Sequence, residues 1–140
     1  MITAPFDRTN SMKRIVIFND ELKTQMQIYL ALCDAYRVEV AEDVEAVMYM
    51  LRKMQPEILL LDYDLEQFRN HGKSSIDFLK KVKKKYAELK VMMLLDDEDR
   101  AEEEKIHEYG ADGVLYKPVK NRNLLKTVNA LSVNRNVIAS

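Results

Sequence analysis

Short apolar runs alternate with longer amphipathic segments along the sequence, and this alternation constrains the fold more than any other feature. The runs cover residues 15–18, 38–40, 58–61, 91–95 and 114–116, and charged or turn-forming residues flank each of them. Their lengths suit β-strands rather than helices. The runs at 58–61 and 91–95 are apolar at every position, which is typical of strands covered on both faces.

Between the runs, apolar residues recur at helical spacing and predict five amphipathic helices. Their apolar faces are Leu22, Met26, Tyr29, Leu30 and Cys33; Val44, Val47, Met48 and Leu51; Ile76, Leu79, Val82 and Tyr86; Ala101, Ile106 and Tyr109; and Leu124, Leu125, Val128 and Leu131. We expect these faces to pack inward, Gly110 to end the fourth helix, and the fifth helix to end near Leu131. Five strand–helix repeats predict an α/β fold, with a doubly wound, five-stranded parallel sheet between two layers of helices.

Composition excludes several other classes of protein. The chain has 140 residues and a net charge of −1, so it has no basic field for nucleic acid or an anionic membrane. No apolar run approaches the roughly 20 residues of a membrane span. The single Cys33 suits a reducing compartment, and we expect a cytoplasmic protein. We assign residues 1–12 to a flexible N-terminal extension, 13–132 to one domain and 133–140 to a C-terminal tail.

Acidic residues and one lysine follow the predicted strands. They are Asp20 after the first strand, Asp62 and Asp64 at the third, Asp96 after the fourth and Lys117 after the fifth. These strand ends share one edge of a parallel sheet, where ligand sites form. Carboxylates gathered there suit Mg²⁺, and a carboxylate beside such a cation and a lysine can attack a phosphorylated donor. Acids also gather in exposed loops, so the inference depends on the whole set.

These segments resemble the receiver domain of two-component response regulators, of the CheY-like kind, over about residues 13–131. The first strand and its acidic pair match RIVIFNDE, and the third strand with the phospho-acceptor matches PEILLLDYDL. The fourth strand matches KVMMLLDDED, and the fifth strand with its lysine and proline matches GADGVLYKPV. The resemblance implies a flavodoxin-like sheet with strand order 2-1-3-4-5.

The resemblance also implies a role for each residue at the strand ends. Asp62 is the phospho-acceptor, Lys117 contacts the phosphoryl group, and Asp20 binds Mg²⁺ together with Asp62. The backbone carbonyl of Asp64 is the third protein ligand. Asn19 stands where the family has a second acid, so it would reach the metal only through a water molecule, and Mg²⁺ binding would be weaker.

Three switch positions depart from the family, which makes the phosphorylation site partly degenerate. Leu95 replaces a serine or threonine that hydrogen-bonds the phosphoryl group, Asp96 replaces a small residue, and Val114 replaces an aromatic residue. We expect Leu95 to be buried or to cover the acceptor pocket, and Asp96 to stand near Asp62. The loop after Asp62, LEQFRNHGKSS, is longer than usual before the third helix resumes at Ile76.

Three functions remain open. The first is a single-domain response regulator that accepts a phosphoryl group on Asp62 from a histidine kinase or phosphotransfer protein. It would act by docking to a target through its fourth helix, fifth strand and fifth helix, and would catalyse only its own phosphoryl transfer and slow autodephosphorylation. The second is a pseudo-receiver that binds partners without phosphorylation. The third and most remote is a haloacid-dehalogenase-type phosphatase, suggested by the Asp62-x-Asp64 motif, although there the lysine precedes the later acid pair.

Two structural predictions test the site assignment. A cis peptide between Lys117 and Pro118 would aim the lysine ammonium toward Asp62. Asp20 and Asp62 should lie close enough to share one cation, and Lys117 should pair with Asp62 when no metal is bound, because two adjacent carboxylates need a neutralising charge.

Overall fold

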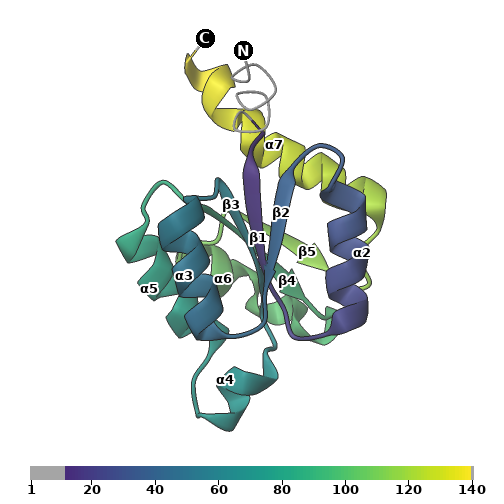
Figure 1. The fold of residues 1–140 in the computed structure, drawn as a ribbon. Coiled ribbons are helices and arrows are strands. Elements are labelled where there is room, and N and C mark those ends of the chain that lie inside the picture. The colour runs from purple at the N-terminus through teal and green to yellow at the C-terminus, as the bar shows by residue number, and fades with distance from the viewer. Residues whose placement is uncertain (1–11, 140) are drawn as a thin grey trace.

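One parallel sheet forms the centre of the computed structural model, which describes residues 12–139. Its order is β2-β1-β3-β4-β5 (Figure 1). The strands are β1 (Arg14–Phe18), β2 (Arg37–Ala41), β3 (Ile58–Asp62), β4 (Lys90–Leu95) and β5 (Gly113–Tyr116). The α/β fold class and the strand order are therefore confirmed. The predicted N-terminal extension, residues 1–12, lies outside the described residues except for Met12.

Helices cover both faces of the sheet, because successive strand side chains point to opposite faces. The helices are α2 (Leu22–Leu32), α3 (Val44–Met54), α4 (Glu66–Asn70), α5 (Ser75–Lys85), the 3₁₀ helix η1 (Asp97–Glu102), α6 (Glu103–Glu108) and α7 (Asn121–Ala139). Helices α2 and α7 lie on one face of the sheet, and α3, α5 and α6 lie on the other (Figure 1). Ile15 and Ile17 of β1 belong to the apolar cluster on the side of α2 and α7, whereas Val16 and Phe18 belong to the cluster on the side of α3, α5 and α6. None of the helices within residues 12–139 is long and apolar enough to cross a membrane.

Capping residues in the sequence set several helix boundaries. Asp43 Oδ1 accepts a hydrogen bond from the Ala46 N–H at 2.7 Å and begins α3. Ser74 Oγ accepts one from the Asp77 N–H at 3.2 Å and begins α5. Each side chain satisfies a backbone donor that the first helical turn leaves free. Gly110 follows α6 with a φ of +117°, a conformation that favours glycine, and it ends this helix as predicted.

The predicted inward face of α2 is wrong. The structure exposes Leu22, Met26, Tyr29 and Leu30 and leaves Cys33 half-buried. It buries the side of the helix that carries Gln25, Ile28 and Leu32. Helical spacing allowed both faces because apolar residues lie on both sides of this helix. The observed orientation of α2 also forms a polar contact, because the Gln25 side-chain amide donates a hydrogen bond to the backbone carbonyl of Asn19.

Three further segments differ from the predictions. The fourth predicted helix begins as the 3₁₀ helix η1, and Ala101 is exposed rather than packed inward. The fifth runs to Ala139, not to Leu131, because no glycine or proline follows Pro118 to end it, and most of the predicted tail is therefore helical. The loop after Asp62 contains the short helix α4, and α5 begins at Ser75, one residue earlier than predicted.

Candidate functional site

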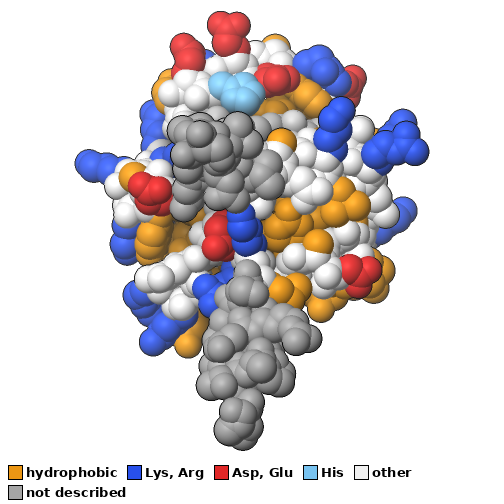
Figure 2. All heavy atoms as spheres, turned by 90° about the horizontal axis from the view of Figure 1, so that it is seen from above, with side chains coloured by type: hydrophobic (Ala, Val, Ile, Leu, Met, Phe, Trp, Pro, Cys, Tyr) orange, Lys and Arg blue, Asp and Glu red, His pale blue; other side chains and the backbone are white. Residues whose placement is uncertain are grey.

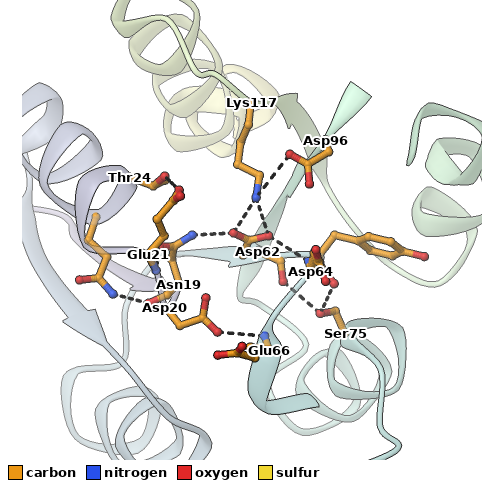
Figure 3. A network of polar contacts seen from close by, with 12 residues as sticks. Asn19, Asp20, Glu21, Thr24, Asp62, Asp64, Glu66, Ser75, Asp96 and Lys117 are labelled. Carbon is orange, nitrogen blue, oxygen red and sulfur yellow. Dashed lines mark hydrogen bonds and ion pairs between the residues drawn. The ribbon is translucent and has the colours of Figure 1, made fainter. Parts of the chain in front are cut away.

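Five of the predicted site residues line one hollow at the carboxyl edge of the sheet. This hollow of about 460 Å³ is open to solvent, and its lining includes Asp20, Asp62, Asp64, Asp96 and Lys117. Figure 3 shows that Asp62 lies at the end of β3 and that the other four residues come from the segments that follow β1, β3, β4 and β5. The parallel sheet therefore brings together acids that lie far apart in the sequence.

The carboxylate of Asp62 lies at the centre and accepts four hydrogen bonds from three donor groups. Its Oδ1 accepts from the Asp64 N–H at 2.9 Å and from the Lys117 ammonium at 3.1 Å. Its Oδ2 accepts from Lys117 at 2.9 Å and from the Asn19 side-chain amide at 2.5 Å. A carboxylate offers about four lone-pair positions, so protein donors use all of them. The predicted pairing of Lys117 with Asp62 is confirmed, as is the cis peptide before Pro118.

Burial and charge shift the pKa values of this pair. Burial raises the pKa of Asp62, which is 2% exposed, and the hydrogen bonds from Asp64 and Lys117 offset only part of that rise. The negative charge of Asp20, which lines the same hollow, adds to the rise in the pKa of Asp62. For Lys117, burial alone would lower the pKa, but the hydrogen bond and charge of Asp62, together with the charges of Asp96 and Glu21, raise the pKa above its ordinary value.

The switch positions take different places around the site. Asp96 lies near Asp62 as predicted, because its Oδ1 is 3.8 Å from the same Lys117 ammonium (Figure 3). Leu95 is fully buried, which confirms that part of the prediction. Val114 is half-buried and packs in the apolar layer with α3 and α5. Position 95 therefore brings no hydroxyl group to the site, although Thr24 lines the same hollow.

Asn19 bonds directly to the candidate acceptor, a contact that the sequence analysis missed. Its side chain is buried, its nitrogen donates to Asp62, and its Oδ1 accepts from the Glu21 N–H at 2.7 Å. The amide thus has a protein partner at each end. An amide beside an acid is a donor–acceptor pair, and that signal could have identified the contact.

Two acids of the hollow are held by the segment 65–72, which was predicted only as a lengthened loop. Asp20 Oδ2 accepts from the Glu66 N–H at 2.9 Å (Figure 3), and Asp64 Oδ1 lies 2.8 Å from Arg69 Nε. Phe68, in the middle of the segment, is 4% exposed. An aromatic residue within a polar loop was the signal for such an anchored segment.

The donor set fits a magnesium ion that keeps most of its water. Within residues 12–132, no three His, Cys, Asp or Glu side chains are arranged to hold a metal. Asp20 and Asp62 nevertheless share the hollow, and Mg²⁺ in proteins is often bound by one or two carboxylates plus waters and phosphate oxygens. Two carboxylates meet that requirement, whereas they would not make a closed structural metal site.

Comparisons with known proteins agree with this architecture. The receiver domain of a two-component response regulator from Bacteroides fragilis is 24% identical, over 86% of this chain and 98% of that chain, with a TM-score of 0.77. Chemotaxis protein CheY4 from Vibrio cholerae is 22% identical over 86% and 99%, with a TM-score of 0.76. The receiver domain of NtrX from Brucella abortus is 21% identical over 84% and 96%, with a TM-score of 0.75.

Identities this low show a shared fold alone, but a family model adds the sequence pattern. The model of the response regulator receiver domain matches residues 15–129, which include the five strands except the first residue of β1, Arg14, and every residue of the hollow named above. Because this match spans most of the chain, the protein belongs to the response regulator receiver domain family of two-component signalling.

Proposed function

We propose that this receiver accepts a phosphoryl group on Asp62 from a histidine kinase or phosphotransfer protein. The observation that carries the proposal is the contact of the Lys117 ammonium with both oxygens of Asp62, at 2.9 and 3.1 Å. The hollow above this pair is open to solvent, so a phosphorylated donor has a route to the carboxylate.

In this reaction an oxygen of Asp62 attacks phosphorus, and the bond between phosphorus and the donor breaks. The attacking oxygen must first give up one of its protein donors. Lys117 stays beside the transferred group and stabilises its negative charge. Asp20, Asp62, the backbone carbonyl of Asp64 and, through water, Asn19 would hold Mg²⁺. When bound, Mg²⁺ supplies positive charge to the phosphoryl oxygens.

Partner surfaces on two sides of the molecule complete the proposal. The exposed apolar residues of α2 lie on the same helix as Lys23, Thr24 and Gln27, which line the hollow, and we assign this flank to the phosphoryl donor. Figure 2 shows hydrophobic side chains exposed on the flank where α2 and α7 lie in Figure 1. We assign the downstream target to the face of α6, β5 and α7, where Tyr116 and Lys126 line a second hollow. A cytoplasmic location belongs to the same proposal.

Mass spectrometry tests the phosphorylation directly. The full chain is incubated with Mg²⁺ and a small phosphodonor, and a mass gain of one phosphoryl group is expected. Asp62→Ala should abolish the gain, whereas Asp64→Asn, which changes another acid of the same hollow, should retain it. A gain that persists in Asp62→Ala, or no gain in the wild type, would contradict the proposal.

The pseudo-receiver remains the second candidate, and Leu95 is the observation that favours it. This buried leucine leaves its position without a hydroxyl to bond a phosphoryl oxygen. Partner binding by wild type, Asp62→Ala and Leu95→Thr, each with and without phosphodonor, separates the two functions. Equal binding throughout favours the pseudo-receiver, whereas binding that tightens about tenfold on phosphorylation of the wild type favours a working switch.

A further inference from the structure

The segment 65–72, which contains α4, is anchored to the body of the domain. The Phe68 ring lies 5.7 Å from Phe18 and 5.5 Å from Phe78, measured between ring centroids. The Gln67 side chain donates to the Glu42 carbonyl at 2.7 Å and accepts from the Val44 N–H at 3.2 Å. Apolar and polar contacts thus fix the position of α4 relative to β1 and α3.

From this anchored position, α4 engages two acids that line the hollow but do not hydrogen-bond Asp62 through their side chains. The Glu66 N–H holds one oxygen of Asp20 at 2.9 Å. The Arg69 guanidinium holds Asp64 at 2.8 Å, and both of these side chains are partly exposed. The negative charges of Asp20 and Asp64, which would favour a divalent cation, therefore already have partners in α4.

We propose that the Arg69–Asp64 pair is an intrachain latch that opposes cation binding at the Asp20–Asp62 site. This inference rests on the proposed function, since it concerns the same magnesium site. The Asp64 carboxylate can attract a cation near Asp62. That attraction is weaker while the positive charge of Arg69 neutralises the Asp64 carboxylate. Conversely, a bound cation attracts the carboxylates of Asp20 and Asp64 and weakens their contacts with Glu66 and Arg69 of α4.

Charge removal gives the sign and size of the expected effect. Arg69→Gln leaves Asp64 as an unpaired carboxylate, so Mg²⁺ should bind more tightly. Solvent screens this exposed pair, and exposed pairs are worth about 0.2–1 kcal/mol, which corresponds to at most about a fivefold change in affinity. We expect a two- to fivefold lower dissociation constant for Mg²⁺.

The first test is a calorimetric Mg²⁺ titration of the full chain without any phosphodonor. Arg69→Gln is compared with Lys73→Gln, which removes the same charge from an exposed residue of the same loop but leaves the Asp64 contact in place. The double variant Arg69→Gln/Asp64→Asn should bind Mg²⁺ within about twofold of the wild type, because neither charge remains. Tightening in Arg69→Gln alone supports the latch. Equal tightening in Lys73→Gln, or unchanged affinity in Arg69→Gln, overturns it.

The second test follows the segment rather than the metal. Hydrogen exchange of residues 65–72 should become faster when Mg²⁺ binds, and exchange that is unchanged or slower overturns the latch. Phosphorylation of Asp62 is scored separately. If Asp62 is phosphorylated normally but Arg69→Gln does not change the affinity for Mg²⁺, the latch alone is refuted. If Arg69→Gln changes the affinity for Mg²⁺ but Asp62 is not phosphorylated, only the proposed phosphoryl transfer is refuted.

Discussion

Replacing Asn19 by aspartate would remove a hydrogen-bond donor from Asp62 and place a second carboxylate against it. The Asn19 amide nitrogen is 2.5 Å from Asp62 Oδ2, and the Asn19 side chain is fully buried. Solvent therefore screens the new pair of charges little. Without a metal, the variant should be less stable than the wild type, and Mg²⁺ should reverse much of that loss.

The distances set the magnitude. Two carboxylate charge centres about 4 Å apart repel by about 4 kcal/mol at an effective dielectric constant of about 20. The lost hydrogen bond adds about 1 kcal/mol, and attraction to Lys117 offsets part of the total. We therefore expect a net loss of about 3 kcal/mol in the free energy of unfolding. A divalent cation attracts the added carboxylate, so Mg²⁺ should bind at least about tenfold more tightly, a gain of about 1.4 kcal/mol.

Urea unfolding near neutral pH, with and without Mg²⁺, measures both effects. At a Mg²⁺ concentration about 100 times its dissociation constant, binding adds about 2.7 kcal/mol and should restore most of the lost stability. Asn19→Ala is the matched control, because it removes the hydrogen bond without adding charge and should not improve Mg²⁺ affinity. The reasoning is refuted if Asn19→Asp matches the wild type in metal-free stability and in Mg²⁺ affinity.

Three further predictions concern the same region. Lys117→Met should lower the free energy of unfolding by about 3–5 kcal/mol at neutral pH, because it leaves the buried Asp62 carboxylate without its cation. The loss should become smaller on acidification, as Asp62 takes up a proton. A loss that is the same at acidic pH would contradict this cause. Burial raises the pKa of Asp62 above its ordinary value of 3.8, so the folded state binds this proton more tightly than the unfolded state. The contribution of Asp62 to stability should therefore fall as pH rises from 3.8 to the raised pKa, and urea titrations of wild type against Asp62→Asn should show that slope only in the wild type. Phe68→Ala should destabilise the domain by about 3–5 kcal/mol, whereas truncation of the exposed Lys73 to alanine should change unfolding by less than about 0.5 kcal/mol.

The fold could be predicted from the sequence because each strand and most helices carry a strong periodic signal. The run ILLL at residues 58–61 is apolar throughout and lies in the central strand β3, buried on both faces. Helix α2 carries a weaker signal, since apolar residues such as Leu30 and Ile28 lie on opposite sides of it. Periodicity alone does not choose between two such faces, and tertiary contacts made the choice.

The site could be predicted only in outline. The convergence of Asp20, Asp62 and Lys117 follows from strand ends meeting at one edge of a parallel sheet. The contacts made by Asn19 and Arg69 do not follow from that rule, because they depend on side-chain orientation and on the path of a lengthened loop. Contacts of this kind join residues from separate loops, so residue types such as an amide beside an acid can suggest a contact, whereas residue spacing does not identify the partner.

Phe68 of α4, which packs on Phe18 and Phe78, changes the energy balance of the lengthened connection between β3 and α5. A flexible loop loses only about 0.6 kcal/mol for each doubling of its length. Burying one phenylalanine side chain contributes about 1.5–3 kcal/mol, and Phe68 is almost fully buried. Burial of Phe68 therefore exceeds the closure cost of the added length and offsets part of the larger cost of ordering these residues, which is about 1–2 kcal/mol for each backbone unit. The exposed positions of α4 other than Arg69 are thus free to vary, provided that an aromatic residue is kept at position 68.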